Sequence, residues 1–205
     1  VGMQQASKKL NLLNANEYAV LKNEMFANGN QALPFSNTNL GEGTNWQDSV
    51  FKTAMVRDYN INVSGGSDKT TYSIGGSYFN QDGIVGLDKA NFNRINGRVN
   101  LSTEMSSKLK LNSVFLYTKE ERSALPENGI GSVLYNTVNA FPTDPVRDAN
   151  GNFTYLEEVS DIINPIAQMQ NTYNSSRVNK FVGKEELVYD ILPNLSFTNR
   201  FNYNY

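Results

Sequence analysis

The chain has 205 residues, a formal net charge of -2, and neither cysteine nor histidine. Without cysteine there are no disulfides or thiolate metal sites, and without histidine the commonest general base and metal ligand is missing. No basic stripe is available for phosphate backbones, so we expect no nucleic-acid binding. Hydrophobic residues make up only 39%, yet Tyr and Phe number 11 each, which is more typical of a structure with a second, wet face than of a soluble core.

The first element predicted in chain order is a helix near residues 15–28. Asn14 is a candidate N-cap, and Glu17 stands three residues later, where it can close a capping box. Apolar residues then recur at helical spacing, so we expect a short amphipathic helix packed on a larger body. Its expected apolar face consists of Tyr18, Leu21 and Met25.

From about residue 57 apolar and polar residues alternate with a period of two. In the first strand Tyr59, Ile61 and Val63 share one face, while Asn60 and Asn62 share the other. The pattern continues to residue 119 and returns over 177–205, although charged residues blur it in the first half of that segment. It predicts a four-strand meander over 57–119 and a hairpin over 177–205.

The connections between these strands fall into two classes. Short turns near 65–69, 104–108 and 191–194 alternate with longer segments at 6–56, 81–91 and 120–176. Transmembrane barrels sort their connections in this way, with short periplasmic turns and long extracellular loops. Aromatic residues fall at the long-loop ends of the strands, where an interfacial girdle belongs. These are Tyr59, Tyr78, Phe92 and Tyr117.

We therefore predict an all-β chain, an antiparallel up-and-down transmembrane β-barrel segment of about seven strands with short helices in its extracellular loops. No run of 18 or more apolar residues suggests a membrane-spanning helix. Neither end resembles the terminus of a mature protein, so we expect residues 1–205 to be part of one larger barrel domain. The residues expected to face lipid are Tyr72, Ile74, Val99, Leu101, Leu111 and Phe115, and those expected to face the lumen are Asn60, Asn62, Ser73, Asn96, Arg98, Asn100 and Asn112.

The long segment 120–176 breaks the alternation. We expect a short helix over 130–140 that ends before Pro142, a turn at 148–151, and an interruption of regular structure at Pro165.

No set of residues in this sequence predicts catalysis. Asp82 and the pairs at 120–121 and 157–158 are the obvious carboxylates, but all lie in or beside predicted loops. Neighbouring strand residues point to opposite faces, which is poor geometry for shared acid–base chemistry. We expect no enzymatic activity and no cofactor.

One spacing resembles a calcium loop. With Gly151 in the sixth place, the third, fifth and twelfth places fall on Asp148, Asn150 and Glu157. The first place falls on Val146, which cannot supply an acidic ligand. An Asn-Gly turn is therefore favoured over a metal site.

Three residues are candidates for ligand binding. Trp46, the single tryptophan, is either an exposed platform for a sugar ring or an anchor that holds the first loop on the barrel rim, and we favour the anchor. Asn96 and Arg98 lie on the polar face of a strand, where amide and guanidinium groups suit polar oligomers.

Several segments together carry a family resemblance. Residues 43–48 (GTNWQD), 59–66 (YNINVSGG), 70–73 (TTYS) and 76–84 (GSYFNQDGI) resemble the SusC/RagA family of TonB-dependent transporters. Residues 10–18 (LNLLNANEY) look like the segment that follows the family's first barrel strand, and residues 189–195 (YDILPNL) look like a periplasmic turn. The resemblance covers essentially the whole chain.

The resemblance implies a 22-stranded outer-membrane barrel of a Gram-negative bacterium, closed by a plug. It also implies a SusD-like surface lipoprotein and TonB as partners, and active import of oligosaccharides or oligopeptides. In this reading the chain is part of the barrel wall and contacts outer-membrane lipid, while the TonB-contacting segment lies elsewhere. The alternative is a soluble extracellular β-rich module that binds glycan, which detergent-free purification of the intact protein would favour.

Overall fold

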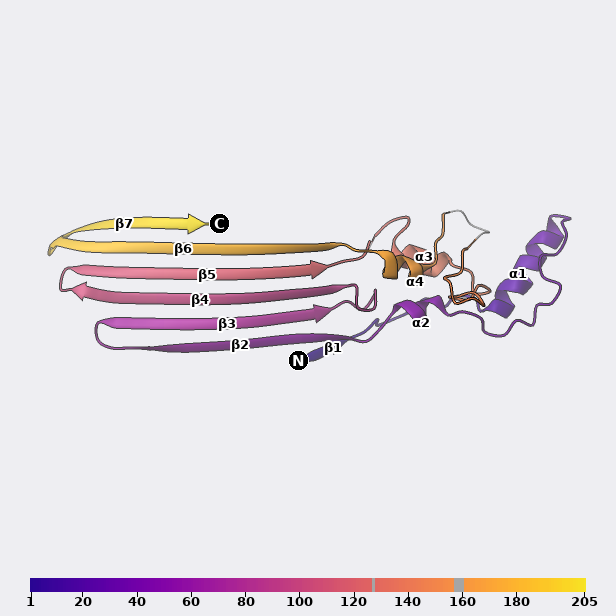
Figure 1. Cartoon of the computed structure of the whole chain (residues 1–205), viewed down its shortest axis with the longest axis horizontal. Helices are drawn as coiled ribbons and strands as arrows, with labels where there is room; N and C mark the ends of the chain where they lie inside the picture. Colours follow the sequence, from indigo (N-terminus) through magenta and orange to yellow (C-terminus); the bar gives the residue numbers. More distant parts are fainter. Residues whose placement is uncertain (127, 157–160) are drawn as a thin grey trace.

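The fold is dominated by one antiparallel sheet of seven strands, ordered in space as they are in the chain (Figure 1). The computed structural model describes residues 1–126, 128–156 and 161–205. The predicted all-β meander and its seven strands are confirmed. The strands are β1 (Gly2–Gln4), β2 (Ala54–Gly66), β3 (Thr70–Asp82), β4 (Asn91–Ser106), β5 (Leu109–Ser123), β6 (Ser175–Leu192) and β7 (Leu195–Asn204).

The connections separate onto the two ends of this sheet. Short turns at 67–69, 107–108 and 193–194 lie at one end, and the long segments 5–53, 83–90 and 124–174 lie at the other (Figure 1). The strands between them are 13 to 18 residues long from β2 to β6. At about 3.3 Å per residue and a tilt near 40°, about ten residues are enough to cross a hydrocarbon core.

The pairing register separates the side chains onto two faces. Val63 pairs with Ile74, Ile74 with Val99, and Val99 with Phe115, so that one apolar row crosses four strands. The row beside it has the opposite parity, and its pairs include Ser73 with Asn100. Because partners in an antiparallel ladder share a face, all six residues predicted to face lipid lie on one face and all seven predicted to face the lumen lie on the other.

Three of the four expected girdle aromatics share the apolar face. Tyr59 stacks on Tyr78, with ring centroids 6.3 Å apart, and Tyr117 pairs with Phe181 of β6. The assignment of Phe92 to this girdle was wrong. Its register partner is Gln81, which puts its ring on the polar face, 6.0 Å from the ring of Phe79.

No segment that the structure describes covers the apolar face of the sheet. Ile61 and Ile74 are 71% and 51% exposed, although a sheet in water buries such a face against a second layer. Apolar surface left uncovered across several neighbouring strands marks a contact with another protein or with lipid. Among the helices that the structure describes, none is long and apolar enough to cross a membrane.

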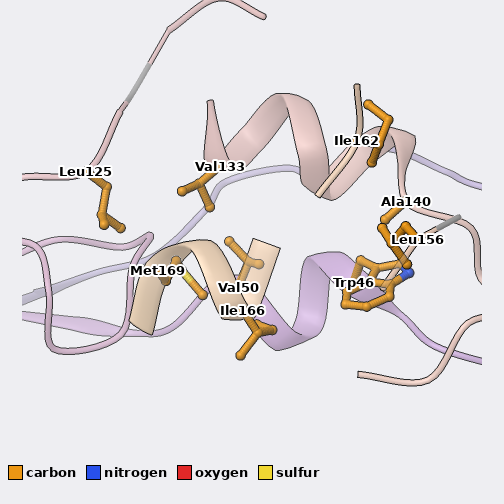
Figure 2. Packing of buried hydrophobic residues seen from close by; sticks show 9 residues of the cluster. All are labelled: Trp46, Val50, Leu125, Val133, Ala140, Leu156, Ile162, Ile166 and Met169. Atoms are coloured by element: carbon orange, nitrogen blue, oxygen red, sulfur yellow. The ribbon is translucent and has the colours of Figure 1, made fainter. Parts of the chain in front are cut away.

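The buried core lies in the long connections instead (Figure 2). Three short helices pack there: α2 (Trp46–Val50), α3 (Val133–Asn139) and α4 (Pro165–Asn171). We call this unit the loop cluster. Its buried apolar residues are Trp46, Val50, Leu125, Val133, Ala140, Leu156, Ile162, Ile166 and Met169.

Two predictions for the loop segments need correction. Pro165 does not interrupt regular structure but begins α4, because the first helical position needs no N–H donor and suits the fixed φ of proline. The predicted helix at 130–140 is shorter and forms α3, with Ser132 as its N-cap.

The first helix, α1 (Ala15–Asn28), forms with the predicted capping box of Asn14 and Glu17. Its predicted packing face is right only for Tyr18, which stacks on Phe141. Leu21 and Met25 are more than half exposed, while Ala15 and Ala19 are buried. The helix points away from the sheet (Figure 1), and beyond its first turns it is held by Asn23, whose side chain bonds to both the carbonyl and the N–H of Phe35.

Candidate functional site

The polar face of the sheet holds a shallow hollow of about 520 Å³. Its lining residues occupy three adjacent register rows that cross β2 to β5. The outer two rows carry their side chains on the polar face. The middle row contributes backbone atoms, and its glycines Gly76 and Gly97 have no side chain. Ile74, Val99 and Tyr78, which flank the middle row on the apolar face, do not line it. The hollow therefore opens on the polar face.

Asn96 and Arg98 both line this hollow but differ in their contacts. The Asn96 amide donates to Ser77 Oγ at 2.8 Å, and its oxygen accepts from Thr118 Oγ1 at 2.9 Å. Arg98 is exposed and makes no hydrogen bond or ion pair with any residue that the structure describes. Asn96 thus cross-links three strands, whereas the guanidinium of Arg98 keeps its donors available.

Nearer the short turns, the same face carries an ion network around Glu186. Its carboxylate accepts from Arg200 of β7 and from the Asn112 amide at 3.2 Å, and Lys184 lies 3.4 Å away. These partners come from three neighbouring strands, which holds the carboxylate in the wall of the sheet. The polar face therefore combines amides, hydroxyls and paired charges, as an interior in contact with water does.

Trp46 is placed in the loop cluster. Its side chain is 3% exposed and its indole Nε1–H donates to the carbonyl of Phe141 at 2.8 Å. The Thr44 N–H reaches the carbonyl of Pro142 at the same distance, so the first and third long connections are held together. Trp46 thus anchors the first connection to the third, and its buried ring presents no open face for sugar stacking.

The calcium-like spacing folds as a turn over its described part. The Asp148 carboxylate accepts from the backbone N–H groups of Asn150 and Asn152, at 2.9 and 2.8 Å. Gly151 has a φ of +83°, which suits glycine in this turn. Glu157, the third candidate ligand, lies outside the described residues, as does Glu158. In the described ranges no three acidic residues gather as a metal site.

A second hollow of about 420 Å³ lies between residues 10–14, 42–47 and 138–142. Tyr18 borders it and stacks on Phe141, with ring centroids 5.0 Å apart. It belongs to the loop end of the molecule, where the first and third long connections meet.

Sequence reasoning missed two buried amides that organise the loop cluster. Asn136 is fully buried and donates to Gln168 Oε1 at 2.8 Å, which joins α3 to α4. Asn164 caps α4 and its amide donates to the Val146 carbonyl at 2.9 Å. The Asn-Pro pair at 164–165 is a signal for a helix start that could have identified the second of these.

Comparison with curated proteins finds TonB-dependent receptors, although no family model matches the chain. TonB-dependent receptor P26 of Formosa agariphila is 30% identical over 188 residues, and receptor P3 of the same organism is 25% identical over 208 residues. TonB-dependent receptor SusC of Bacteroides thetaiotaomicron is 24% identical over 222 residues. The matches cover 88%, 98% and 95% of this chain but only 18%, 20% and 21% of the relatives. The chain therefore spans about a fifth of their length.

Solved structures agree with this at the level of the fold. A structure of the RagAB peptide transporter matches 99% of the chain and 27% of its own, with a TM-score of 0.75 and 18% identity. A structure of the RagAB peptide importer in its closed-closed state gives a TM-score of 0.70 over 98% of the chain and 26% of its own, again at 18% identity. The sequence relatives and the fold together show that the chain belongs to the SusC/RagA-type TonB-dependent receptors, as part of their β-barrel.

Proposed function

We propose that the chain forms part of the wall and outer loops of an outer-membrane transporter that imports polar oligomers with energy from TonB. The observation that carries this proposal is the two-faced sheet. An uncovered apolar face, a polar face with amides and ion pairs, and connections sorted by length between the two ends suit a wall between lipid and water. The proposed activity is transport rather than catalysis.

The proposal places the short turns in the periplasm and the loop cluster outside the cell. The sequence contains no cysteine, so single cysteines can be introduced into the intact protein. A cysteine at Leu33, in the first long connection, should react with a membrane-impermeant maleimide on intact cells. One at Asp68, in a short turn, should react only after lysis. The reverse pattern, or equal labelling of both, would contradict the proposed orientation.

The cargo is proposed as an oligosaccharide or an oligopeptide. The RagAB structures are those of a peptide transporter, whereas the polar face here is rich in amides that suit either class. Uptake of labelled oligomers of both classes, by cells with and without TonB, tests the proposal. Import of one class should disappear without TonB, and uptake independent of both TonB and this protein would refute it.

A SusD-like surface lipoprotein is proposed as the partner at the loop end. Support comes from the exposed apolar residues of α1, including Val20, Leu21 and Met25, because uncovered apolar surface marks interaction sites. Replacing Leu21 and Met25 with Gln should weaken co-purification of the lipoprotein with the intact transporter. The matched change of the exposed Ala27 and Asn28 to Gln should leave it unaffected.

A further inference from the structure

A row of polar side chains crosses five strands on the apolar face, one step beyond the aromatic residues. Its members pair in register as Arg57 with Asn80, Asn80 with Asn93, Asn93 with Glu121, and Glu121 with Arg177. We call these five residues the rim row. They share a face with Tyr59, Tyr78 and Tyr117. On β2, β3 and β5 the rim-row residue lies two or four residues from one of these tyrosines. On β4 and β6 it lies two or four residues from a register partner of one, Ile95 or Phe181.

Side-chain bonds tie the rim row together. The Arg57 guanidinium donates to Asn80 Oδ1 at 2.6 Å, and the Asn80 amide donates to Asn93 Oδ1 at 2.7 Å. Arg177 Nε lies 2.8 Å from Glu121 Oε1, and Lys119 Nζ lies 3.1 Å from the same oxygen. Two cations therefore share one carboxylate at the β5–β6 side of the row, which leaves a surplus positive charge there.

A hollow of about 440 Å³ opens beside these cations. It is lined by Asn93, Glu121 and Arg177 of the rim row and by Asn91, Ser123 and Ser175 of the next row outward on the same face. Arg122 and Ser176, which pair in the row between these two, complete the lining. Its walls thus offer amides, hydroxyls and the guanidinium of Arg177, which is 68% exposed at its side chain. These groups suit the hydroxyls of a sugar that carries an anionic substituent.

The height of the hollow points to the lipid interface. Lys119 is two residues beyond Tyr117, which corresponds to about 5 Å along the membrane normal for a strand tilted near 40°. Tyr117 itself donates to Asn179 Oδ1 at 3.1 Å, so its hydroxyl already faces the polar layer. On β5 and β6 the face below it is apolar as far as Leu109, except for Ser113 and its register partner Glu185, which hydrogen-bond to each other. The cations therefore lie at the level of headgroups and point outward, away from any cargo in the lumen.

We propose that Lys119, Arg177 and the adjoining hollow bind the phosphate of a phosphorylated glycolipid in the outer leaflet. The inference rests on the proposed outer-membrane location of the sheet. It adds a lipid site on the outer surface that is separate from the import route on the polar face.

The test uses the full-length protein, extracted from the outer membrane in a mild detergent, with retained glycolipid measured by native mass spectrometry. The variant Lys119→Gln/Arg177→Gln should lose retention by roughly tenfold or more, because each cation near an anionic lipid surface contributes several-fold to binding. The matched control is Arg94→Gln/Lys180→Gln, which removes the same charge from the long-loop ends of β4 and β6 on the opposite face. The control should retain glycolipid as the unmodified protein does.

Two further measurements separate charge from folding and from transport. The pair Lys119→Arg/Arg177→Lys should restore most of the retention, and enzymatically dephosphorylated glycolipid added to the unmodified protein should bind weakly. Equal retention by the Gln variant and its control, failure of the charge-conserving pair, or unchanged binding of the dephosphorylated lipid would overturn the proposal. If the Gln variant loses glycolipid while its surface labelling and import stay intact, the lipid site is supported. If the cysteines at Leu33 and Asp68 show the reverse maleimide pattern in the otherwise unmodified protein, the proposed function itself has failed.

Discussion

The sheet and the loop cluster solve the problem of burial in opposite ways. The loop cluster covers its tryptophan, its Met169 and most of its apolar residues with protein, and it satisfies the buried amide of Asn136 with hydrogen bonds. The sheet leaves Ile61 and Ile74 largely uncovered and gains its order from backbone ladders and cross-strand pairs. The loop cluster is therefore built for water, and the sheet is built for a surrounding that is itself apolar on one side.

This contrast means that the same kind of substitution should have opposite consequences in the two regions. Truncating an apolar side chain should cost most in the loop cluster, where it leaves a cavity in protein. Adding a charge should cost most on the apolar face of the sheet, where it meets lipid. The following predictions test that difference in the intact protein, from the largest expected effect to the smallest.

Trp46→Ala should destabilise the loop cluster by about 3–5 kcal/mol, because it removes a large buried ring and leaves the Phe141 carbonyl without its donor. Hydrogen exchange of α2, α3 and α4 should accelerate while the strands remain protected. Ile74→Ala on the sheet is the control and should change exchange little, since lipid or detergent fills the space. Similar exchange in both variants would remove the distinction between the regions.

Ile74→Arg should destabilise the folded protein in a bilayer by about 2–4 kcal/mol, the cost of a cation on the lipid face near the midplane. Its neighbour provides the control, because Ser73→Arg puts the same charge on the opposite face and should cost much less. Equilibrium unfolding in lipid vesicles measures both. An equal or larger cost for the serine position would reverse the assignment of the two faces.

Asn164→Ala should cost about 1–3 kcal/mol of loop-cluster stability, because it removes the cap of α4 and the amide that bonds the carbonyls of Val146 and Thr154. The exposed amide of Asn139, whose one hydrogen bond within the described residues goes to the Tyr135 carbonyl, serves as the comparison. Limited proteolysis within the third long connection should quicken in the first variant and stay unchanged in Asn139→Ala. No difference between them would show that the bridging amide is dispensable.

Asn14→Ala should weaken α1 by about 1 kcal/mol, since the capping box loses its side-chain acceptor. The effect should appear as faster hydrogen exchange in the first turn of the helix, with the loop cluster unaffected. Asn28→Ala at the other end of the helix should have a smaller effect. Spread of the change into α2 would mean that the helix and the loop cluster unfold together.

The sheet was predictable because the residues that determine its strands and turns lie close together in the sequence. A period of two fixes the two faces, and the position of each turn fixes which strands pair, as the matching of Ile74 with Val99 shows. Phe92 was misassigned because nearness to a strand end gives height but not the face. It lies three residues before Ile95, so the period of two already puts it on the polar face, where it pairs with Gln81. The capping box of α1 was also predictable, because its residues are close together in the sequence. The face on which the helix packs depends instead on which distant segments reach it.

The loop cluster was less predictable because its contacts join distant segments. The hydrogen bond from Trp46 to Phe141 spans 95 positions, and the Lys52 N–H bonds to the Ile84 carbonyl of another connection. Neither leaves a periodic trace in the sequence. Asn96 could be identified as polar and inward-facing, but its role between Ser77 and Thr118 follows only from the strand register.

The central claim is that one face of the sheet meets lipid and the other meets water. Single cysteines at Ile74 and Val99 in the full-length protein, each carrying a depth-sensitive fluorophore in vesicles with lipid-borne quenchers, test it most directly. Both labels should be quenched from the hydrocarbon and shielded from a water-soluble quencher, while labels at Ser73 and Asn100 should show the opposite response. Ready access of the aqueous quencher to positions 74 and 99 would contradict the account.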